Sequence, residues 1–259
     1  MIEFELKEGS GPLLVTAIHD GHSIRPQLLP HFLLTDGERL REEDPFTGSL
    51  TNISSQSLVV KTSRFETDLN RSPDKAIYIN PEDAWGLELY KTSLSKELID
   101  TSRRNYEEFY IGLKVYIDKI LEREPWLIVY DLHSYNHRRD GVDRFANPRE
   151  NPEINIGTGN THPEWQPVVD VLIDRLSKFN FQGRHLDVRE NIKFQGGYFS
   201  KWLSENFGER ICPIAIEFKK FFMDEWTGKE DQAQLQAIRQ MLISTIDPVL
   251  KSAMKSKRT

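Results

Sequence analysis

The sequence predicts an α/β fold, a three-layer α/β/α sandwich around a mixed, mostly parallel central sheet. Short apolar runs typical of strands alternate with longer segments in which apolar residues recur every three or four positions, as in amphipathic helices. The run at 126–132, WLIVYDL, is apolar on both faces, as expected for a central strand that helices cover on each side. Because no repeat, linker or change in composition divides the chain, we expect one domain over residues 1–259.

Each expected element follows from one of these two patterns. Strands are predicted at 13–18, 58–61, 76–79, 126–132, 185–188 and 211–218. Helices are predicted at 100–123, 163–179 and 231–254. In the first helix, one face carries Phe109, Leu113, Tyr116 and Ile120. Open α/β sheets collect functional residues where strands end and loops begin, so the strand ends are the place to look for a site.

Composition excludes several classes of protein. The 38% of hydrophobic residues and 29% of charged residues suit a folded globular chain. The formal net charge of −6 and the pI of 5.7 argue against a nucleic-acid binder, which needs a basic face. No run approaches the ~18 apolar residues of a membrane span, and the acidic N-terminal segment lacks the apolar core of a signal peptide. With Cys212 as the single cysteine, no internal disulfide is possible, and we expect a cytoplasmic protein.

Two predicted strands end on a histidine. LLVTAIHDGHS ends its apolar run at His19, and Gly21 then permits a sharp turn. WLIVYDLHSYN ends at His133, and the alternation of a strand puts Asp131 on the same side, where it can accept the imidazole N–H. An imidazole fixed at a strand end is a good zinc ligand. Taken alone, His19 is explained equally well as a loop histidine, but the two histidines together predict a metal site.

An acidic loop offers the third ligand. Glu42, Glu43 and Asp44 stand just before a proline in ERLREEDPFTG, and in an arbitrary sequence such a run is a solvated turn. If a metal is bound, a carboxylate from this loop completes a set of two histidines and one carboxylate, with the fourth position left for water. Asp44 is the first choice and Glu43 the alternative.

The segment SRFETDLNRSP carries residues suited to an acidic substrate. It presents Arg64, Asp68, Asn70 and Arg71 ahead of a proline that marks an irregular turn. A guanidinium can grip a carboxylate with two parallel hydrogen bonds. The alternative is a structural ion pair between Asp68 and one of the two arginines.

Glu217 ends the strongly apolar run of ICPIAIEFKK. A carboxylate at such a place needs a partner or a role. Beside a metal site, a glutamate with a raised pKa is suited to be the general base and then the proton donor to a leaving amine. The alternative is an ion pair with Lys219, Lys220 or an arginine.

Taken in order, these segments resemble the N-formylglutamate amidohydrolase family, whose members are similar to zinc carboxypeptidases and aspartoacylases. The matching residues are His19-Asp20-Gly21, Asp44-Pro45-Phe46-Thr47, Ser63-Arg64, Asp68-Leu69-Asn70-Arg71, Asp131-Leu132-His133-Ser134, Gly196-Gly197-Tyr198, and Ile216-Glu217 followed by Met223-Asp224-Glu225. They run from position 19 to about 225, and the Asp-Leu-Asn-Arg and Asp-Leu-His-Ser segments are the most specific.

The resemblance implies one Zn²⁺ per chain, a catalytic glutamate and a grip on the substrate carboxylate. The implied metal ligands are His19, an acidic residue near Asp44, and His133; the base is Glu217, and the substrate carboxylate is held by Arg71 and Asn70. We further expect Arg64 or Arg144 to help to hold the acidic substrate. Two departures from the family pattern stand out. His22 follows the first histidine where the family has a small or hydroxyl residue, and is an alternative ligand. The stretch 137–144 makes the rim beside His133 basic.

The expected activity is hydrolysis of the amide bond of a small acidic N-acyl amino acid, with N-formyl-L-glutamate, giving formate and glutamate, as the first candidate. Two alternatives stay open. One is a zinc carboxypeptidase or another deacylase of N-acyl amino acids, which differs in the size of its acyl pocket. The other is a relative that binds an acidic ligand without turnover, against which the presence of His19, His133 and Glu217 argues.

Overall fold

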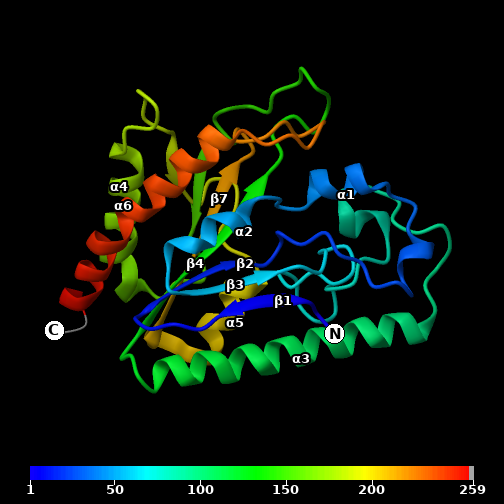
Figure 1. Ribbon diagram of the computed structural model, residues 1–259, viewed down its shortest axis with the longest axis horizontal. Coiled ribbons are helices and arrows are strands. Elements are labelled where there is room, and N and C mark those ends of the chain that lie inside the picture. The colour runs from blue at the N-terminus through cyan, green and yellow to red at the C-terminus, as the bar shows by residue number, and fades with distance from the viewer. Residues whose placement is uncertain (257–259) are drawn as a thin grey trace.

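The computed structural model describes residues 1–256 and contains one seven-stranded mixed sheet with helices on both faces (Figure 1). The strand order is β1-β3-β2-β4-β7-β5-β6. The strands are β1 Phe4–Lys7, β2 Leu13–Ala17, β3 Gln56–Val60, β4 Leu127–Tyr135, β5 Ile154–Gly157, β6 Val188–Glu190 and β7 Ile211–Lys219. The central strands β3, β2, β4 and β7 are parallel, whereas β1 pairs antiparallel with β3 and β5 antiparallel with β7. The predicted α/β sandwich with a mixed sheet is confirmed.

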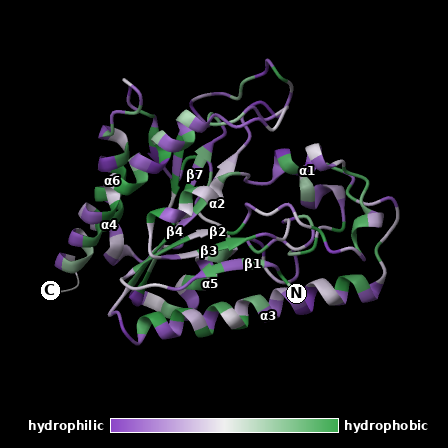
Figure 2. Ribbon diagram, in the orientation of Figure 1, coloured by the Kyte–Doolittle hydropathy of each residue, from purple (hydrophilic) through white to green (hydrophobic). Residues whose placement is uncertain are grey.

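Two pairs of helices cover the sheet. The long helix α3 (Lys96–Leu121) and α5 (Tyr198–Phe207) cover one face, and α4 (Gln166–Lys178) and α6 (Gln232–Ser256) cover the other (Figure 1). The shorter helices are α1 Asp36–Glu42 and α2 Thr47–Leu50, with 3-10 turns at Leu29–His31, Thr51–Ile53, Pro81–Ala84, Pro163–Trp165 and Gly208–Arg210. Hydrophobic residues concentrate on the strands and on the helix sides that face them (Figure 2).

The alternation of side chains along β4 explains why both faces are covered. Leu127 and Val129 pack in the core under α3 and α5, and the intervening Ile128 and Tyr130 pack under α4 and α6. All nine residues of β4 are buried. The prediction of a central strand that is apolar on both sides is therefore confirmed. None of the helices within residues 1–256 has the length and apolar character needed to cross a membrane.

The observed elements differ from the expected ones in three places. The apolar run 76–79 is not a strand: Ala76 and Tyr78 are buried in an irregular loop, where the Asp68 N–H donates to the Ala76 carbonyl at 2.7 Å. Its apolar character reflects burial in loop packing, which periodicity cannot distinguish from a strand. Strands β1 and β5 lie in segments that we did not expect to be strands, and β6 begins at Val188, where the predicted run ends.

The parallel strands bring the predicted site residues to one edge of the sheet. β2, β4 and β7 lie side by side, with Thr16 opposite Asp131 and His133 opposite Glu217. Parallel neighbours end at the same edge, and residues directly opposite each other point to the same face. His133 and Glu217 therefore lie side by side, and the end of β2 carries His19 to the same edge.

Candidate active site

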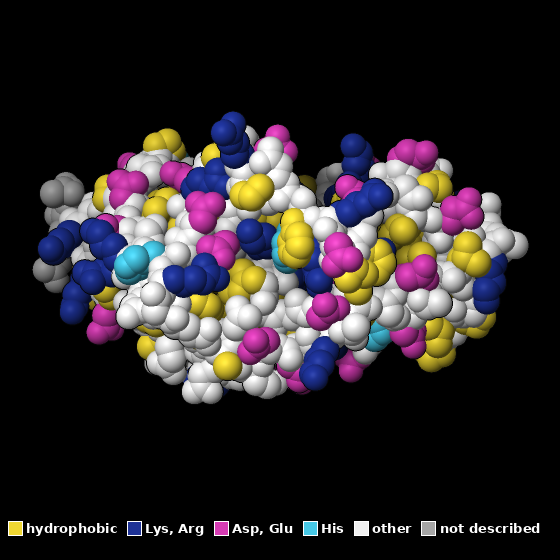
Figure 3. Space-filling model, turned by 90° about the horizontal axis from the view of Figure 1, so that it is seen from above, with side chains coloured by type: hydrophobic (Ala, Val, Ile, Leu, Met, Phe, Trp, Pro, Cys, Tyr) yellow, Lys and Arg dark blue, Asp and Glu magenta, His cyan; other side chains and the backbone are white. Residues whose placement is uncertain are grey.

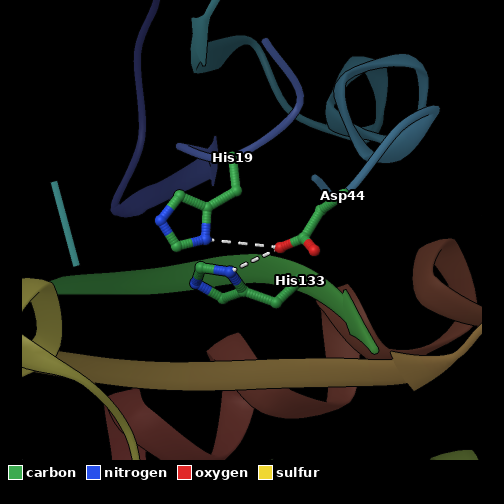
Figure 4. Close-up of side chains that lie close together, drawn as sticks. All are labelled: His19, Asp44 and His133. Carbon is green, nitrogen blue, oxygen red and sulfur yellow. Dashed lines mark hydrogen bonds and ion pairs between the residues drawn. The ribbon is translucent and has the colours of Figure 1, made fainter. Parts of the chain in front are cut away.

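His19, Asp44 and His133 converge in the interior, from the end of β2, the loop after α1 and β4 (Figure 4). One oxygen of Asp44, Oδ2, lies 3.4 Å from Nδ1 of His19 and 3.0 Å from Nδ1 of His133. One ligand atom from each residue falls within 4.8 Å of the other two, and all three side chains are buried. The structure thus brings together the three residues predicted to bind metal.

A second carboxylate orients each imidazole. Nε2 of His19 lies 2.7 Å from Oδ1 of Asp68, and Nε2 of His133 lies 2.8 Å from Oδ2 of Asp131. Asp131 is itself held by the Thr16 hydroxyl, which donates to its Oδ1 at 2.7 Å. Metal-binding histidines commonly donate their second ring N–H to a carboxylate in this way, which fixes the tautomer and the ring orientation. Both Nδ1 atoms are thereby left to face Asp44.

The charges of this cluster favour a bound cation. Burial alone would raise the pKa of Asp44, but its hydrogen bonds to His133 and His19 hold that pKa below its usual range. Burial alone would lower the pKa of His133, but Asp131 and Glu217 raise it well above its ordinary value. Carboxylates therefore outnumber the two imidazoles around this buried cluster. Two imidazole nitrogens and a carboxylate oxygen, all buried and aimed at one another, fit a divalent transition metal.

The alternative ligands form a pair of their own. Nδ1 of His22 lies 2.5 Å from Oε2 of the buried Glu43, whose other oxygen accepts a hydrogen bond from Ser63. Neither His22 nor Glu43 belongs to the three-residue cluster. Asp44, rather than Glu43, is therefore the acidic residue that the structure places between the histidines.

Backbone contacts place Asp44 between the histidines. Its N–H donates to the carbonyl of His19 at 2.9 Å. The ammonium of the fully buried Lys220 donates to the carbonyls of Arg41 and Glu43, each at 2.6 Å, and so fixes the chain just before Asp44. From the sequence, Lys220 was expected only as a partner of Glu217. The turn that Lys220 stabilises lies far away in the sequence, so no local pattern relates the two.

Glu217 is buried without a hydrogen-bond or ion-pair partner among residues 1–256. Lys219 donates to the carbonyl of Asn151 and Lys220 to the carbonyls before Asp44, so neither forms the ion pair considered as an alternative. Burial is the main cause that raises the pKa of Glu217 to about 7. A carboxyl group with this pKa, beside His133 on the neighbouring strand, can both accept and return a proton near neutral pH.

A cavity of about 590 Å³ opens over the cluster and is lined by most of the predicted residues. Its walls include His19, Asp44, His133, Glu217, Arg64, Asn70 and Arg71. Arg64 donates to Asp68 at 2.8 Å, so the structural ion pair considered as an alternative is present. Nε of Arg71 lies farther from the same carboxylate, at 3.9 Å, and the Arg71 side chain is 37% exposed. Asp68 therefore leaves most of the guanidinium donors of Arg71 unused.

The basic rim beside β4 is present, but it uses a different arginine. Arg144 is exposed on the loop after β4 and does not line the cavity, contrary to the expectation that it helps to hold substrate. Arg139 of the same loop lines the cavity instead, with Lys193 from the loop after β6. No sequence signal separates Arg139 from Arg144, because the loop that carries them has no periodicity. Lys193, three residues before the Gly-Gly pair, is not among the residues expected from the sequence.

Gly197 makes room for Asn70. A Cβ atom at position 197 would lie 2.2 Å from Oδ1 of Asn70, which accepts a hydrogen bond from the N–H of Phe199 at 3.0 Å. We expect Gly197→Ala to displace Asn70 and to lower the free energy of unfolding by about 1–3 kcal/mol, the usual cost of overpacking. The control is Gly112→Ala in α3, where nothing lies within 4 Å of the added Cβ, and where the helix should gain stability. Urea denaturation of both variants tests this, and equal stabilities would contradict the expected contact.

Fold and site together define the class of α/β proteins that carry a buried His-Asp-His cluster at the carboxyl edge of a parallel sheet, next to a buried glutamate. Residues 11–223 match the family model of N-formylglutamate amidohydrolase. The match covers most of the chain, which therefore belongs to the N-formylglutamate amidohydrolase family.

Two crystal structures share the fold. An N-formylglutamate amidohydrolase from Ralstonia eutropha JMP134 aligns with a TM-score of 0.74 at 19% identity, covering 100% of this chain and 99% of that one. The gene product Atu2144 from Agrobacterium tumefaciens aligns with a TM-score of 0.71 at 18% identity, covering 98% and 96%. At these identities the likeness bears on the fold alone. No curated protein matches the sequence significantly.

Proposed function

We propose that the protein is a zinc-dependent amidohydrolase that cleaves the amide bond of an acidic N-acyl amino acid, with N-formyl-L-glutamate as the first candidate. The observation that carries the proposal is the position of Glu217. It is a buried carboxylate without a partner among the described residues, beside a buried His-Asp-His set in the wall of one cavity. Membership of a family named for this reaction supports the reaction class.

His19, Asp44 and His133 would hold one zinc ion per chain. Three protein ligands of this kind are typical of catalytic zinc, with the fourth position left for water or substrate. When bound, zinc supplies a Lewis acid that polarises the scissile carbonyl and lowers the pKa of water. Asp68 and Asp131 keep both rings in the orientation that binding needs.

Glu217 would move the proton. Ionised, it accepts a proton from water as the water oxygen bonds to the amide carbon. As the C–N bond breaks, it returns that proton to the nitrogen, so that a carboxylic acid and an amine leave the site. A pKa of about 7 suits both steps near neutral pH.

Asn70 and Arg71 would bind the carboxylate of the substrate. Oδ1 of Asn70 is occupied by the N–H of Phe199, so its side-chain NH₂ group is left to donate to a ligand. The guanidinium of Arg71 lies over the ring of Tyr78, with 5.5 Å between its Cζ and the ring centroid. Within residues 1–256 it makes one weak hydrogen bond, to the Asp83 carbonyl at 3.3 Å. Both residues line the cavity. Arg64 adds positive charge to the same wall.

The variant Arg71→Lys tests whether Arg71 binds the carboxylate of the substrate. We expect kcat/KM for N-formyl-L-glutamate to fall by about 10- to 100-fold, because the ammonium cannot form the two parallel hydrogen bonds of a guanidinium. Arg144→Lys is the matched control, since Arg144 is exposed outside the cavity. Steady-state kinetics of both variants provide the comparison. A larger loss in Arg144→Lys than in Arg71→Lys would contradict the assignment.

A substrate panel tests the proposed function itself. Varying the acyl group and the amino acid separately, from N-formyl-L-glutamate to N-acetyl-L-glutamate, N-formyl-L-leucine and a dipeptide, should show the highest kcat/KM for acidic amino acids with a small acyl group. Preference for the dipeptide would favour a carboxypeptidase. No turnover of any member by the zinc-loaded protein would remove the proposal.

A further inference from the structure

The cavity holds two cations that the reaction described above does not use, Arg139 and Lys193. Both line the same walls as Glu217 and Arg71. They come from different loops, one after β4 and the other after β6. On the face of the molecule seen from above, lysine and arginine side chains lie beside hydrophobic ones near the middle (Figure 3).

The side chain of Lys193 contacts an amide group and two aromatic rings. Its ammonium donates to the side-chain oxygen of Asn151 at 2.6 Å and lies 5.1 Å and 5.6 Å from the ring centroids of Tyr135 and Phe194. Within residues 1–256, no carboxylate lies at ion-pair distance from it. Lys193 is exposed and lines the cavity, so its ammonium can reach an anionic group of a ligand bound there.

Asn155, which lies opposite Glu217, fixes the backbone of Lys193. Oδ1 of Asn155 accepts from the N–H groups of Lys193 at 2.8 Å and Ile192 at 3.0 Å, and its NH₂ group donates to the Phe194 carbonyl at 2.8 Å. Asn155 lies on β5 directly opposite Glu217. The position of Lys193 is therefore tied to the strand next to the catalytic residue.

Arg139 reinforces the positive charge at this end. It pairs with Glu42 at 2.7 Å and lies 5.1 Å from the ring centroid of Trp85, which Arg64 contacts at 4.9 Å. Partial desolvation in the cavity, and then repulsion from Arg139, lower the pKa of Lys193. An anionic group bound between the two side chains would reduce this repulsion.

We propose that Lys193, assisted by Arg139, forms a second carboxylate subsite, so that the protein selects substrates with two carboxylates, one on Arg71 and Asn70 and the other on Lys193. This inference rests on the proposed function. The second carboxylate belongs either to the amino-acid side chain or to the acyl group, and both offer Lys193 the same chemistry.

Two matched pairs of substrates distinguish these sources. N-formyl-L-glutamate against N-formyl-L-glutamine varies the side chain, and N-succinyl-L-alanine against N-butyryl-L-alanine varies the acyl group. We expect the wild type to prefer the dicarboxylate in one pair. Lys193→Met should reduce that preference, measured as a ratio of kcat/KM values, by about 10- to 100-fold, and Lys193→Arg should retain most of it. The pair that shows the preference identifies the source.

Lys201→Met is the matched control, because Lys201 is exposed on α5, pairs with Glu205 and does not line the cavity. An unchanged preference in Lys193→Met, or no preference in the wild type, would overturn the subsite. If no substrate is turned over, the proposed function fails, and calorimetric binding of glutarate against butyrate still tests the subsite. Tighter binding of glutarate that Lys193→Met abolishes would support it, and equal binding of both acids would overturn it.

Discussion

Replacing Glu217 by glutamine is expected to lower kcat by about 10²- to 10⁴-fold while zinc stays bound, because general base catalysis contributes about that factor. Glutamine keeps the shape of the side chain but cannot accept the proton of water. His19, Asp44 and His133 are unchanged by the substitution, so the metal content should equal that of the wild type. Steady-state kinetics and elemental analysis on the same preparation measure both quantities.

The pH dependence of the wild type should follow from the same residue. A base works only when ionised, so kcat/KM should fall as the pH drops through the pKa of Glu217, which burial raises to about 7. A bound cation stabilises the ionised form and moves this fall to a lower pH. The control Glu205→Gln, on the surface of α5, should keep the profile of the wild type. Near-native turnover in Glu217→Gln with zinc still bound would mean that another group is the base.

His133→Ala is expected to abolish both activity and the stabilisation that zinc provides. A ligand that binds only the folded state stabilises it by about 4 kcal/mol when present at a thousand times its Kd. The wild type should therefore melt at a lower temperature after treatment with a chelator, whereas the variant should show no such response. Differential scanning calorimetry with and without chelator makes the comparison. An equal response in both proteins would place the metal elsewhere.

The cluster could be predicted because its two histidines stand where apolar strand sequences end. An apolar run that ends on His19 or His133 fixes each residue at the edge of the sheet, and the alternation along β4 placed Asp131 behind His133 correctly. Glu217 could be singled out because a carboxylate at the end of an apolar strand is costly to bury. In each case local sequence alone constrained the geometry.

The residues that were missed depend on loop packing. The partner of His19 is Asp68, which approaches from a separate loop, so no spacing in the sequence relates the two. The choice between Arg139 and Arg144 is likewise made by the path of an irregular loop. Loops carry no periodic pattern, and their course is decided by tertiary contacts.

The strands show the same limit. Those with long apolar runs, such as β4 and β7, were predicted because burial on both faces leaves a strong signal. The four-residue β5 was not predicted, because it lies within a polar stretch. The run 76–79 was assigned as a strand because a loop that packs into the core has the same composition.

His19, Asp44 and His133 are proposed to bind one metal ion. Elemental analysis of wild-type protein purified without a chelating tag, next to His133→Ala, tests this proposal most directly. We expect about one zinc ion per chain in the wild type and little in the variant. No metal in the wild type, even after dialysis against zinc, would contradict it, as would equal zinc in the two proteins.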